Sequence, residues 1–558
     1  MNKFLIRGLV VASTGLALTA GLSSCNDLTL EPKYERTPDK VYVDLASYRQ
    51  VLAKVYGGFA VTGLGSDDNG ASGGGDVQGI DEGTSDYIRQ LWSAQVLSTD
   101  EGIIAWGDAG VRDWHNMNWT ASNPLTRGLY YRIYYEIAIA NEFIRESSDE
   151  KLNARLSGAD VAQAKRYRAE ARFLRAVAYM HVLDLYGGGP FVTDTDPAGV
   201  FTPPYRNRQQ IFEYVESELL ALSNDPDFAD PRTNEYGRVD KAAAWGMLSR
   251  LYLNAQVYTA SAPGLRDGTA RYTEAATYAK RVIDVPGYAL STTAAGNIAS
   301  GYGRLFLADN HTSPARNEII WPVTFDANNT RSFGGTTFLV NGSTSPSNTA
   351  WKSKVGMPQG GWGGMRATKN LFNLFGADTA RDTRGRFWTQ GQTLEINDIG
   401  TFTEGYGVLK FRNVTSAGTQ LGGSQSQSSI DYPMIRLGEM MLNYAEAVKR
   451  GGTGDAALAL TYVNQLRARA YANATGSAIT AAQLTTDYLL DERGRELFWE
   501  GFRRTDLIRY GKFTDGSYVW PWKGGTAAGR GVESFRALYP IPASDRAVNP
   551  NLPQNPGY

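Results

Sequence analysis

Two pairs of acidic residues have the chemical type that glycoside hydrolysis requires. One pair is Asp100 and Asp108, and the other is Glu492 and Glu496. A glycoside hydrolase needs two carboxyl groups roughly 5–10 Å apart across a cleft, one as the acid and one as the nucleophile or base. The most closely spaced carboxylates of this chain alternate with arginines. A neighbouring arginine lowers the pKa of a carboxyl group, and a carboxyl group with a lowered pKa is a poor general acid. A hydrolase therefore stays as an alternative that the sequence does not favour.

Tryptophans near the first acidic pair suggest ligand binding instead. Residues 92–119 contain Trp92, Trp106, Trp114 and Trp119 among several Asp and Asn residues. Trp106 is followed by Gly-Asp-Ala-Gly, which breaks a helix, so we expect this ring on a loop. Sugar rings stack their C–H faces on aromatic rings, and Asp or Asn side chains bond the hydroxyl groups. Trp106 is thus a candidate sugar contact, whereas we expect Trp114 and Trp119 in the core.

Several other kinds of chemistry lack the residues they need. The chain has one cysteine, Cys25, and three scattered histidines, so it offers no intramolecular disulfide and no Cys- or His-based metal centre. Asp67, Asp68 and Asn69 hint at calcium, but without the spacing of a calcium loop, so a flexible loop is favoured. The 56 basic and 57 acidic residues nearly balance, which disfavours nucleic acid as a partner. We expect no metal and no cofactor.

The N-terminus has the pattern of a secretory signal. Lys3 and Arg7 precede a mostly apolar run from Gly8 to Leu22, and Leu22-Ser23-Ser24-Cys25 follows. This ending resembles the bacterial lipobox, in which the cysteine is lipidated and becomes the first residue of the mature protein. We therefore expect a signal peptide over 1–24, a lipidated tether over 25–40 with the lipid on Cys25, and a body over 41–558.

Most of the body has helical periodicity. We expect helices over 43–59, 129–146, 164–185, 209–223, 240–258, 272–283, 433–450 and 456–472. The fold class is mainly α, and antiparallel helix pairs with small residues at their crossings resemble tetratricopeptide repeats. This helical scaffold is assigned to 41–284 and 432–558. The prolines of the last twenty or so residues predict an extended C-terminal strap.

Residues 285–431 have a different composition and interrupt the helices. Gly, Ser, Thr and Asn dominate, with short strands expected near 319–324 and 408–411. Loops this long are usually functional, so we place the ligand side of the molecule here. Trp351 and Trp362, the latter inside Gly-Gly-Trp-Gly-Gly, are the candidate aromatic contacts of this region.

A charged and aromatic stretch over 491–511 suggests either a catalytic centre or a junction of helices. Leu490, Gly494, Leu497, Phe498 and Gly501 recur at helical steps, and we expect Asp491 to pair with Arg495, and Glu500 with Arg504, at i,i+4. Glycines inside a helix suggest close approach of another backbone. Paired charges with glycines and aromatics fit a junction better, so we assign Glu496, Glu500, Arg503, Arg504 and Asp506 to structure.

Several motifs together resemble one known family, SusD/RagB of Bacteroidetes. They are Arg495-Glu496-Leu497-Phe498-Trp499-Glu500-Gly501-Phe502-Arg503-Arg504-Thr505-Asp506-Leu507-Ile508-Arg509, Tyr432-Pro433-Met434-Ile435-Arg436-Leu437-Gly438-Glu439, Tyr444-Ala445-Glu446-Ala447, Arg172-Phe173-Leu174-Arg175-Ala176, Asp184-Leu185-Tyr186-Gly187-Gly188 and the Asn-Pro-Gly-Tyr terminus. The resemblance covers nearly the whole mature chain. Asp27, just after the lipidated cysteine, is similar to the acidic surface-export signal of lipoproteins from these bacteria.

The resemblance implies a binding protein and not an enzyme. Such a protein is anchored by lipid in the outer membrane, faces the exterior, binds a glycan and caps a SusC-like TonB-dependent transporter. A starch-binding member uses an Asp and an Arg eight residues apart and then a tryptophan, a spacing similar to that of Asp81, Arg89 and Trp106. Trp351 or Trp362 would form the opposite wall. Binding of peptides or other nutrients, as in the RagB branch, remains open.

Overall fold

The structure is a computed structural model and describes residues 37–63, 75–197, 199, 201–294, 300–376, 381–421, 423–471 and 476–558. Cys25 and the expected signal peptide lie outside the described residues, as do Asp67, Asp68 and Asn69. Within the described part of the chain, no helix combines the length and the apolar character needed to span a membrane.

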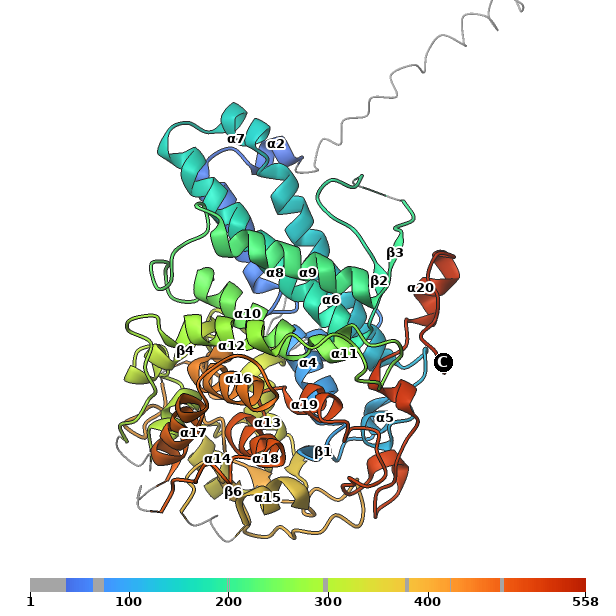
Figure 1. Ribbon diagram of the computed structural model, residues 1–558, viewed down its shortest axis with the longest axis vertical. Helices are drawn as coiled ribbons and strands as arrows, with labels where there is room; N and C mark the ends of the chain where they lie inside the picture. Colours follow the sequence, from blue (N-terminus) through green and yellow to red (C-terminus); the bar gives the residue numbers. More distant parts are fainter. Residues whose placement is uncertain are drawn as a thin grey trace, which may run out of the picture.

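The described chain is mostly helical, as the periodicity predicts. The helices that follow one another in the main array are α6 (Pro124–Glu146), α8 (Ala159–Leu185), α9 (Arg208–Asn224), α10 (Lys241–Leu253), α12 (Tyr272–Ile283), α16 (Leu437–Lys449), α17 (Ala456–Ala470) and α18 (Thr486–Leu497). From α6 to α17 each helix packs on the next one in this series, and α18 packs on α16. Figure 1 shows the array running from α8 and α9 in the upper half through α10 and α12 to α16 and α17. The array therefore passes directly from α12 to α16, with the whole insertion between them in sequence.

Shorter helices complete the scaffold. They are α2 (Pro38–Val41), α3 (Leu45–Gly57), η1 (Gly83–Ser85), α4 (Tyr87–Val96), α5 (Val111–Asn116), α7 (Asp149–Arg155), α11 (Ala255–Tyr258), α19 (Arg503–Arg509), η5 (Lys523–Gly525), η6 (Ser534–Ala537) and α20 (Ala543–Val548). Of these, α3 packs against α6 and α8, and α4 packs against α6 and α19. The helix α4 thereby joins the N-terminal part of the array to the C-terminal signature.

Capping residues explain where several helices begin. The α6 helix starts at Pro124 and not at Leu129, because the Asn123 side chain accepts hydrogen bonds from the Leu125 and Thr126 amides and Pro124 occupies the first turn. Asp240 and Asp455 cap α10 and α17 in the same way. The stop after α8 is confirmed, with Gly187 at a positive φ of 76°.

Two sequence predictions in the C-terminal region are wrong. The segment before α16 is not helical, because Tyr432–Arg436 forms strand β8 against β4 (Ile319–Val323) in an antiparallel pair. The C-terminal strap is not wholly extended, because α20 forms between Pro542 and Pro550. A proline is tolerated just before a helix start, so one short helix fits between the two.

The insertion contains helices as well as the expected short strands. Its helices are α13 (Gly335–Gly342), α14 (Thr349–Val355), α15 (Lys369–Phe375), η2 (Gly301–Phe306) and η3 (Pro314–Glu318). The strand pairs of the described chain are β1 (Gly102–Ile104) with β5 (Met365–Ala367), β2 (Gly189–Pro190) with β3 (Tyr205–Arg206), β4 with β8, and β6 (Phe387–Trp388) with β7 (Gly407–Val408). The strand expected near 319–324 is confirmed, whereas the one near 408–411 is only the two-residue β7. The β1–β5 pair matters most for function, because it joins the Trp106 loop to the Trp362 loop.

The 491–511 stretch is two helices and not one continuous face. The α18 helix ends at Leu497 and α19 starts at Arg503. Between them Trp499 and Gly501 have left-handed backbone, with φ of 66° and 78°. The Trp499 amide donates to the buried Glu101 carboxylate at 3.0 Å, and the Trp92 indole N–H donates to the Trp499 carbonyl at 3.0 Å. Contacts with α4 and β1 therefore hold a turn that the helical periodicity does not indicate.

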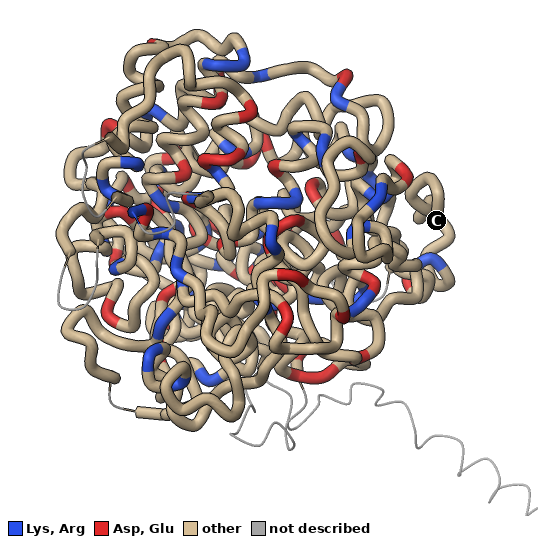
Figure 2. Tube along the Cα trace, turned by 90° about the horizontal axis from the view of Figure 1, so that it is seen from below, with Lys and Arg blue, Asp and Glu red and all other residues tan. Residues whose placement is uncertain are grey.

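Buried ion pairs connect this stretch to distant parts of the chain. Glu496 contacts Arg384 at 3.0 Å and Arg436 at 2.7 Å, and it also pairs with Arg469. Glu500 pairs with Lys410 at 2.6 Å and with Arg436 at 2.7 Å, and not with Arg504 as expected. These buried ion pairs support the assignment of the stretch to a structural junction, and its partners come from tertiary contacts. Elsewhere the charges of both signs intermingle along the trace (Figure 2).

Candidate functional site

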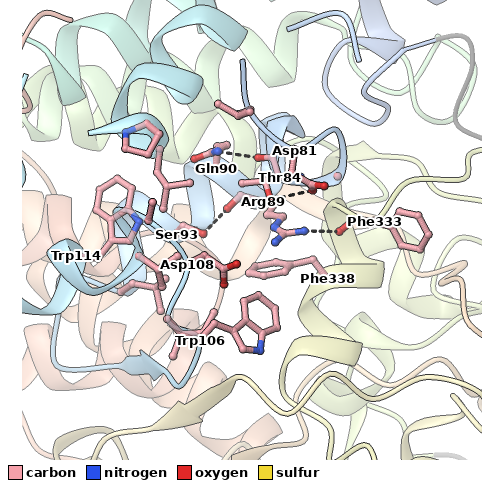
Figure 3. Close-up of a pocket in the computed structure, with 18 of the residues that line it drawn as sticks. Asp81, Thr84, Arg89, Gln90, Ser93, Trp106, Asp108, Trp114, Phe333 and Phe338 are labelled. Carbon is pink, nitrogen blue, oxygen red and sulfur yellow. Dashed lines mark hydrogen bonds between the residues drawn. The ribbon is translucent and has the colours of Figure 1, made fainter. Parts of the chain in front are cut away.

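The cavity of interest is about 780 Å³ in volume and lies beside α4. Four of the five predicted contact residues line it: Asp81, Arg89, Trp106 and Trp362. The wider lining comes from 79–84, α4, the end of β1 with the loop after it, α5, the start of α6 and the insertion, and includes Gln90, Ser93, Asp108, Trp114, Phe333 and Phe338. Figure 3 shows these side chains converging from segments far apart in sequence.

Arg89 is held in a fixed orientation by aromatic rings. Its guanidinium lies 4.7 Å from the centre of the Phe338 ring and 5.7 Å from that of Trp106. It donates a hydrogen bond to the Phe333 carbonyl at 3.1 Å. Burial lowers the pKa of Arg89 to about 10, while nearby carboxylates, Asp81 first, act in the opposite direction. Arg89 is therefore protonated at neutral pH and presents planar donors to the cavity.

Asp86 connects the two halves of the cavity wall. It caps α4 by accepting from the Arg89 amide at 2.8 Å, and it also accepts from the Gly335 amide at 2.9 Å and the Ser332 hydroxyl at 3.2 Å. Gly334 packs directly on the Asp86 side chain, so a Cβ atom at position 334 would clash with it. The loop that carries Phe333 is thus fixed to the start of α4. The sequence signal for this role was an Asp just before a helix start.

Trp106 and Trp362 form an aromatic corner of the cavity wall. Their ring centres are 6.3 Å apart at an interplanar angle of 45°, and both rings are half-buried. The Trp106 indole N–H donates to the Trp362 carbonyl at 3.2 Å, and the Ala105 amide donates to Gly364 at 2.9 Å. The β1–β5 pair extends this ladder from Ile104 and Met365. Trp106 is on a loop, as predicted.

Carboxyl groups surround Arg89 on several sides. Asp81 accepts from the Thr84 amide at 3.1 Å and from the Thr84 hydroxyl at 3.2 Å. Asp81 and Asp108 are exposed. Burial raises the pKa of Glu82, and the neighbouring Asp81 and Asp86 add to this effect. The cavity therefore places hydrogen-bond acceptors and one guanidinium beside flat aromatic surfaces, a combination that suits a ligand with apolar faces and polar edges.

The expectation that Trp351 contacts a ligand is wrong. Its side chain is 1% exposed and packs in the core of the insertion. The ring stacks on Trp388, with centres 5.1 Å apart and planes at 14°, and on Phe402 at 5.9 Å. Trp114 and Trp119 are 1% and 0% exposed, which confirms their assignment to the core.

Sequence reasoning missed the two phenylalanines of the cavity. Phe333 is half-buried and precedes two glycines, whereas Phe338 is buried on α13. The Gly-Gly pair after Phe333 was the available signal, since it resembles the bare backbone around Trp362. The sequence gives no indication that Phe338 lines a cavity, because a phenylalanine in a short apolar run is usually part of the hydrophobic core.

The carboxylate pairs considered for hydrolysis do not face each other across this cavity. Asp100 is buried, with Arg503 donating to both oxygens at 2.7 Å and the Tyr518 hydroxyl at 2.7 Å. Burial alone would raise the pKa of Asp100, but Arg503 outweighs it and the pKa is lowered. Glu492 is also buried, and Arg384 and Arg495 outweigh burial to lower its pKa to about 2. Such carboxylates stay ionised and cannot act as general acids.

Metal ligands do not gather in the described ranges. Among those residues, no group of three or more His, Cys, Asp or Glu side chains is arranged to hold a metal ion.

Known proteins with similar sequences belong to one family. A model of the SusD family matches residues 377–558. The chain is 32% identical to the starch-binding protein SusD of Bacteroides thetaiotaomicron, and the alignment covers 100% of both chains. It is also 24% identical to the SusD-like protein P25 of Formosa agariphila, over 69% of this chain and 71% of that one.

Solved structures of the same superfamily share the fold. A SusD homolog from B. thetaiotaomicron matches with a TM-score of 0.68 at 19% identity, covering 94% of this chain and 99% of that chain. Surface glycan-binding protein A from the same organism, solved in complex with laminarihexaose, matches with a TM-score of 0.65 at 20% identity, covering 91% and 99%. Because the full-length sequence identity and the family model agree with this fold, the chain belongs to the SusD family.

Proposed function

We propose that this protein binds oligo- or polysaccharide at the cell surface and delivers it to a partner TonB-dependent transporter in the outer membrane. The observation that carries the proposal is the cavity in which the half-buried Trp106 and Trp362 rings stand beside Arg89 and Asp81. Two relatives support the ligand class, since one is named a starch-binding protein and another was solved with laminarihexaose.

The binding mechanism follows from the chemistry of the cavity. The C–H face of a sugar ring packs on Trp106 or Trp362, while hydroxyl groups donate to Asp81 and accept from Arg89. Each aromatic contact contributes only about 0.5–1.5 kcal/mol beyond buried area, so a single oligosaccharide binds with modest affinity. A polymer that engages several surface copies gains avidity from effective concentration.

Anchoring and delivery rest on the sequence pattern and on the family. Lipid on Cys25, which lies outside the described residues, would hold the protein at the membrane, and stable anchoring takes more than one acyl chain. Incorporation of labelled palmitate into the protein in cells, and its loss in Cys25→Ala, tests the anchor. Co-purification with a TonB-dependent transporter under mild detergent tests the partner.

The proposal assigns binding without catalysis. The relatives whose names state a function are binding proteins, and Asp100, Glu492 and Glu496 each pair with buried arginines. Incubating the protein with a polysaccharide that it binds, and assaying reducing ends, tests this part. Release of sugar above a no-protein control would contradict it.

Paired variants test the site itself. Affinity gels with starch, laminarin and other polysaccharides, followed by calorimetry with the best oligosaccharide, should show binding by the wild type. The double variant Trp106→Ala with Trp362→Ala should weaken it at least about tenfold, because two stacking faces are lost. Trp245→Ala is the matched control, since Trp245 is a half-buried tryptophan on α10 outside the cavity. Unchanged affinity in the folded double variant would show that the site is elsewhere, and binding of peptides but not glycans would favour the alternative nutrient class.

A further inference from the structure

The cavity carries more negative than positive charge. Asp81, Glu82 and Asp108 line it, and Asp86 lies directly beneath. Among the described residues that line the cavity, Arg89 is the one basic side chain. All four of these acidic residues lie within electrostatic reach of the Arg89 guanidinium. The positive charge is thus already offset before any ligand enters.

Asp108 is the acidic residue most available to a ligand. Asp81 accepts hydrogen bonds from Thr84 and Glu82 is partly buried, but Asp108 is exposed at the cavity edge. In the described part of the chain its carboxylate has no hydrogen-bond donor, and only its backbone carbonyl is used, by the Val111 amide. Figure 3 shows Asp108 on the side of the cavity where Trp106 and Arg89 also lie. A ligand packed on Trp106 therefore meets this carboxylate.

A free carboxylate next to an aromatic face distinguishes neutral from anionic sugars. Its two oxygens accept hydrogen bonds from adjacent hydroxyl groups of one sugar ring, which strengthens the binding of a neutral glycan. A uronate or sulfate group brought to the same place meets a like charge, and Arg89, the one basic side chain among the described lining residues, already has four acidic residues near it. Specificity of this kind comes from repelling the wrong ligand as much as from binding the right one.

We infer that Asp108 makes this cavity selective for neutral glycans and excludes those that carry carboxylate or sulfate groups. The inference rests on the proposed glycan-binding function and deepens it by naming the substrate class. Because charge repulsion excludes the acidic glycans, this exclusion weakens as salt screens the charges. Stacking of neutral sugars on the tryptophans is nearly independent of salt.

The test compares neutral and acidic oligosaccharides on two variants with the same charge change. Calorimetry measures wild type, Asp108→Asn and Asp160→Asn with maltoheptaose and laminarihexaose as neutral probes, and with oligogalacturonates and oligoalginates of similar length. Asp160 is exposed in the first turn of α8, outside the cavity, so Asp160→Asn is the matched control.

The expected pattern is specific to the cavity residue. Wild type and Asp160→Asn should bind a neutral probe and reject the acidic ones. Asp108→Asn should gain at least about tenfold in affinity for an acidic probe at low salt. Its affinity for the neutral probe should fall by about three- to tenfold, because the amide keeps one acceptor oxygen and loses the charge-assisted hydrogen bonds. In 1 M NaCl the wild type should reject acidic probes less strongly.

Other outcomes separate failure of the inference from failure of the proposed function. Wild-type binding of acidic probes as tight as neutral ones overturns the inference while leaving glycan binding intact. The inference also fails if Asp160→Asn shows the same gain as Asp108→Asn, because the effect would then be one of overall charge. If none of the probes binds and the polysaccharide gels are also negative, the proposed function falls together with the inference.

Discussion

At the scale of single residues, exposure decides which tryptophan is available to a ligand. Trp106 and Trp362 each keep one part of the ring open to the cavity, whereas Trp351 is enclosed by Trp388 and Phe402. The three rings are chemically the same and all stand near glycines or polar residues in sequence. Their different roles come from what packs on each ring, and this separates the effect of substitution on stability from its effect on binding.

Trp351→Ala should destabilise the protein without weakening the site. Removing a fully buried tryptophan leaves a cavity and costs about 3–5 kcal/mol of unfolding free energy. Urea unfolding followed by fluorescence measures the loss, and calorimetry at 20 °C on the folded fraction measures ligand affinity. A variant with normal stability and lost binding would show that Trp351 does face the ligand.

At the scale of elements, the junction between α18 and α19 holds the scaffold together. Glu496 and Glu500 collect arginines and a lysine from β8, the insertion and α17. Burial of these charges is favourable only because each has a partner of opposite sign. The turn at Trp499 also brings α4 against this junction, through the Trp92 and Glu101 hydrogen bonds. The family signature therefore supports the cavity from behind without lining it.

Glu500→Ala should lower the melting temperature and leave glycan binding intact. It leaves Lys410 and Arg436 buried with fewer counter-charges, and breaking a buried pair costs about 3–5 kcal/mol. Differential scanning calorimetry measures the change. The control is Asp284→Ala, which removes one side of the exposed Lys280–Asp284 pair and should cost less than about 1 kcal/mol. Lost glycan affinity in a fully folded Glu500→Ala protein would instead place the junction in the binding site.

At the scale of the whole molecule, the helical array is one continuous structure, and the insertion is attached to it at several points. The packing of α12 on α16 closes the array, and the β4–β8 and β1–β5 pairs fix the insertion to it. The cavity is formed where the insertion meets α4, so its shape depends on how these two parts of the fold pack together. Groups buried in the core make stability depend on pH.

His115 should make the protein lose stability on acidification. Its Nδ1 bonds the Leu97 carbonyl at 2.8 Å, and its Nε2 lies 3.1 Å from the Ile104 amide, which donates to it when the ring is neutral. Burial lowers the pKa of His115 to about 3, against 6.5 in the unfolded chain. Between pH 6.5 and 3 the unfolded state binds the proton of this histidine more tightly than the folded state does. The contribution of neutral His115 to the free energy of unfolding is therefore complete above pH 6.5. Below that pH it falls by about 1.4 kcal/mol per pH unit.

The measurement compares wild type with His115→Gln. Urea unfolding at pH 7 and at pH 5 should show a smaller loss for the variant, because glutamine does not titrate. The comparison between variants is needed because Glu101, whose pKa burial raises to about 8, contributes with the opposite sign. If the free energy of unfolding of the two proteins fell by the same amount between pH 7 and pH 5, His115 would not be the group that causes the loss.

Much of the architecture is determined locally and was therefore readable from the sequence. Tyr272–Ile283 matches its prediction, because its apolar residues recur with helical spacing. Where local rules compete with tertiary contacts, the prediction fails. The proline-bearing segment at β8 pairs with a strand more than a hundred residues away, and Trp499 takes a left-handed backbone that its long-range hydrogen bonds support.

The helical scaffold, the motifs of the SusD family and the spacing of Asp81, Arg89 and a loop tryptophan can be recognised in the amino-acid sequence. Tertiary structure alone decided that Trp362 and not Trp351 closes the cavity, that Phe333 and Phe338 support Arg89, and that Glu500 pairs with Lys410 and Arg436. The physical reason is range. Helix periodicity and capping act within a few residues, whereas ring exposure and ion pairing depend on segments that folding brings together from opposite ends of the chain.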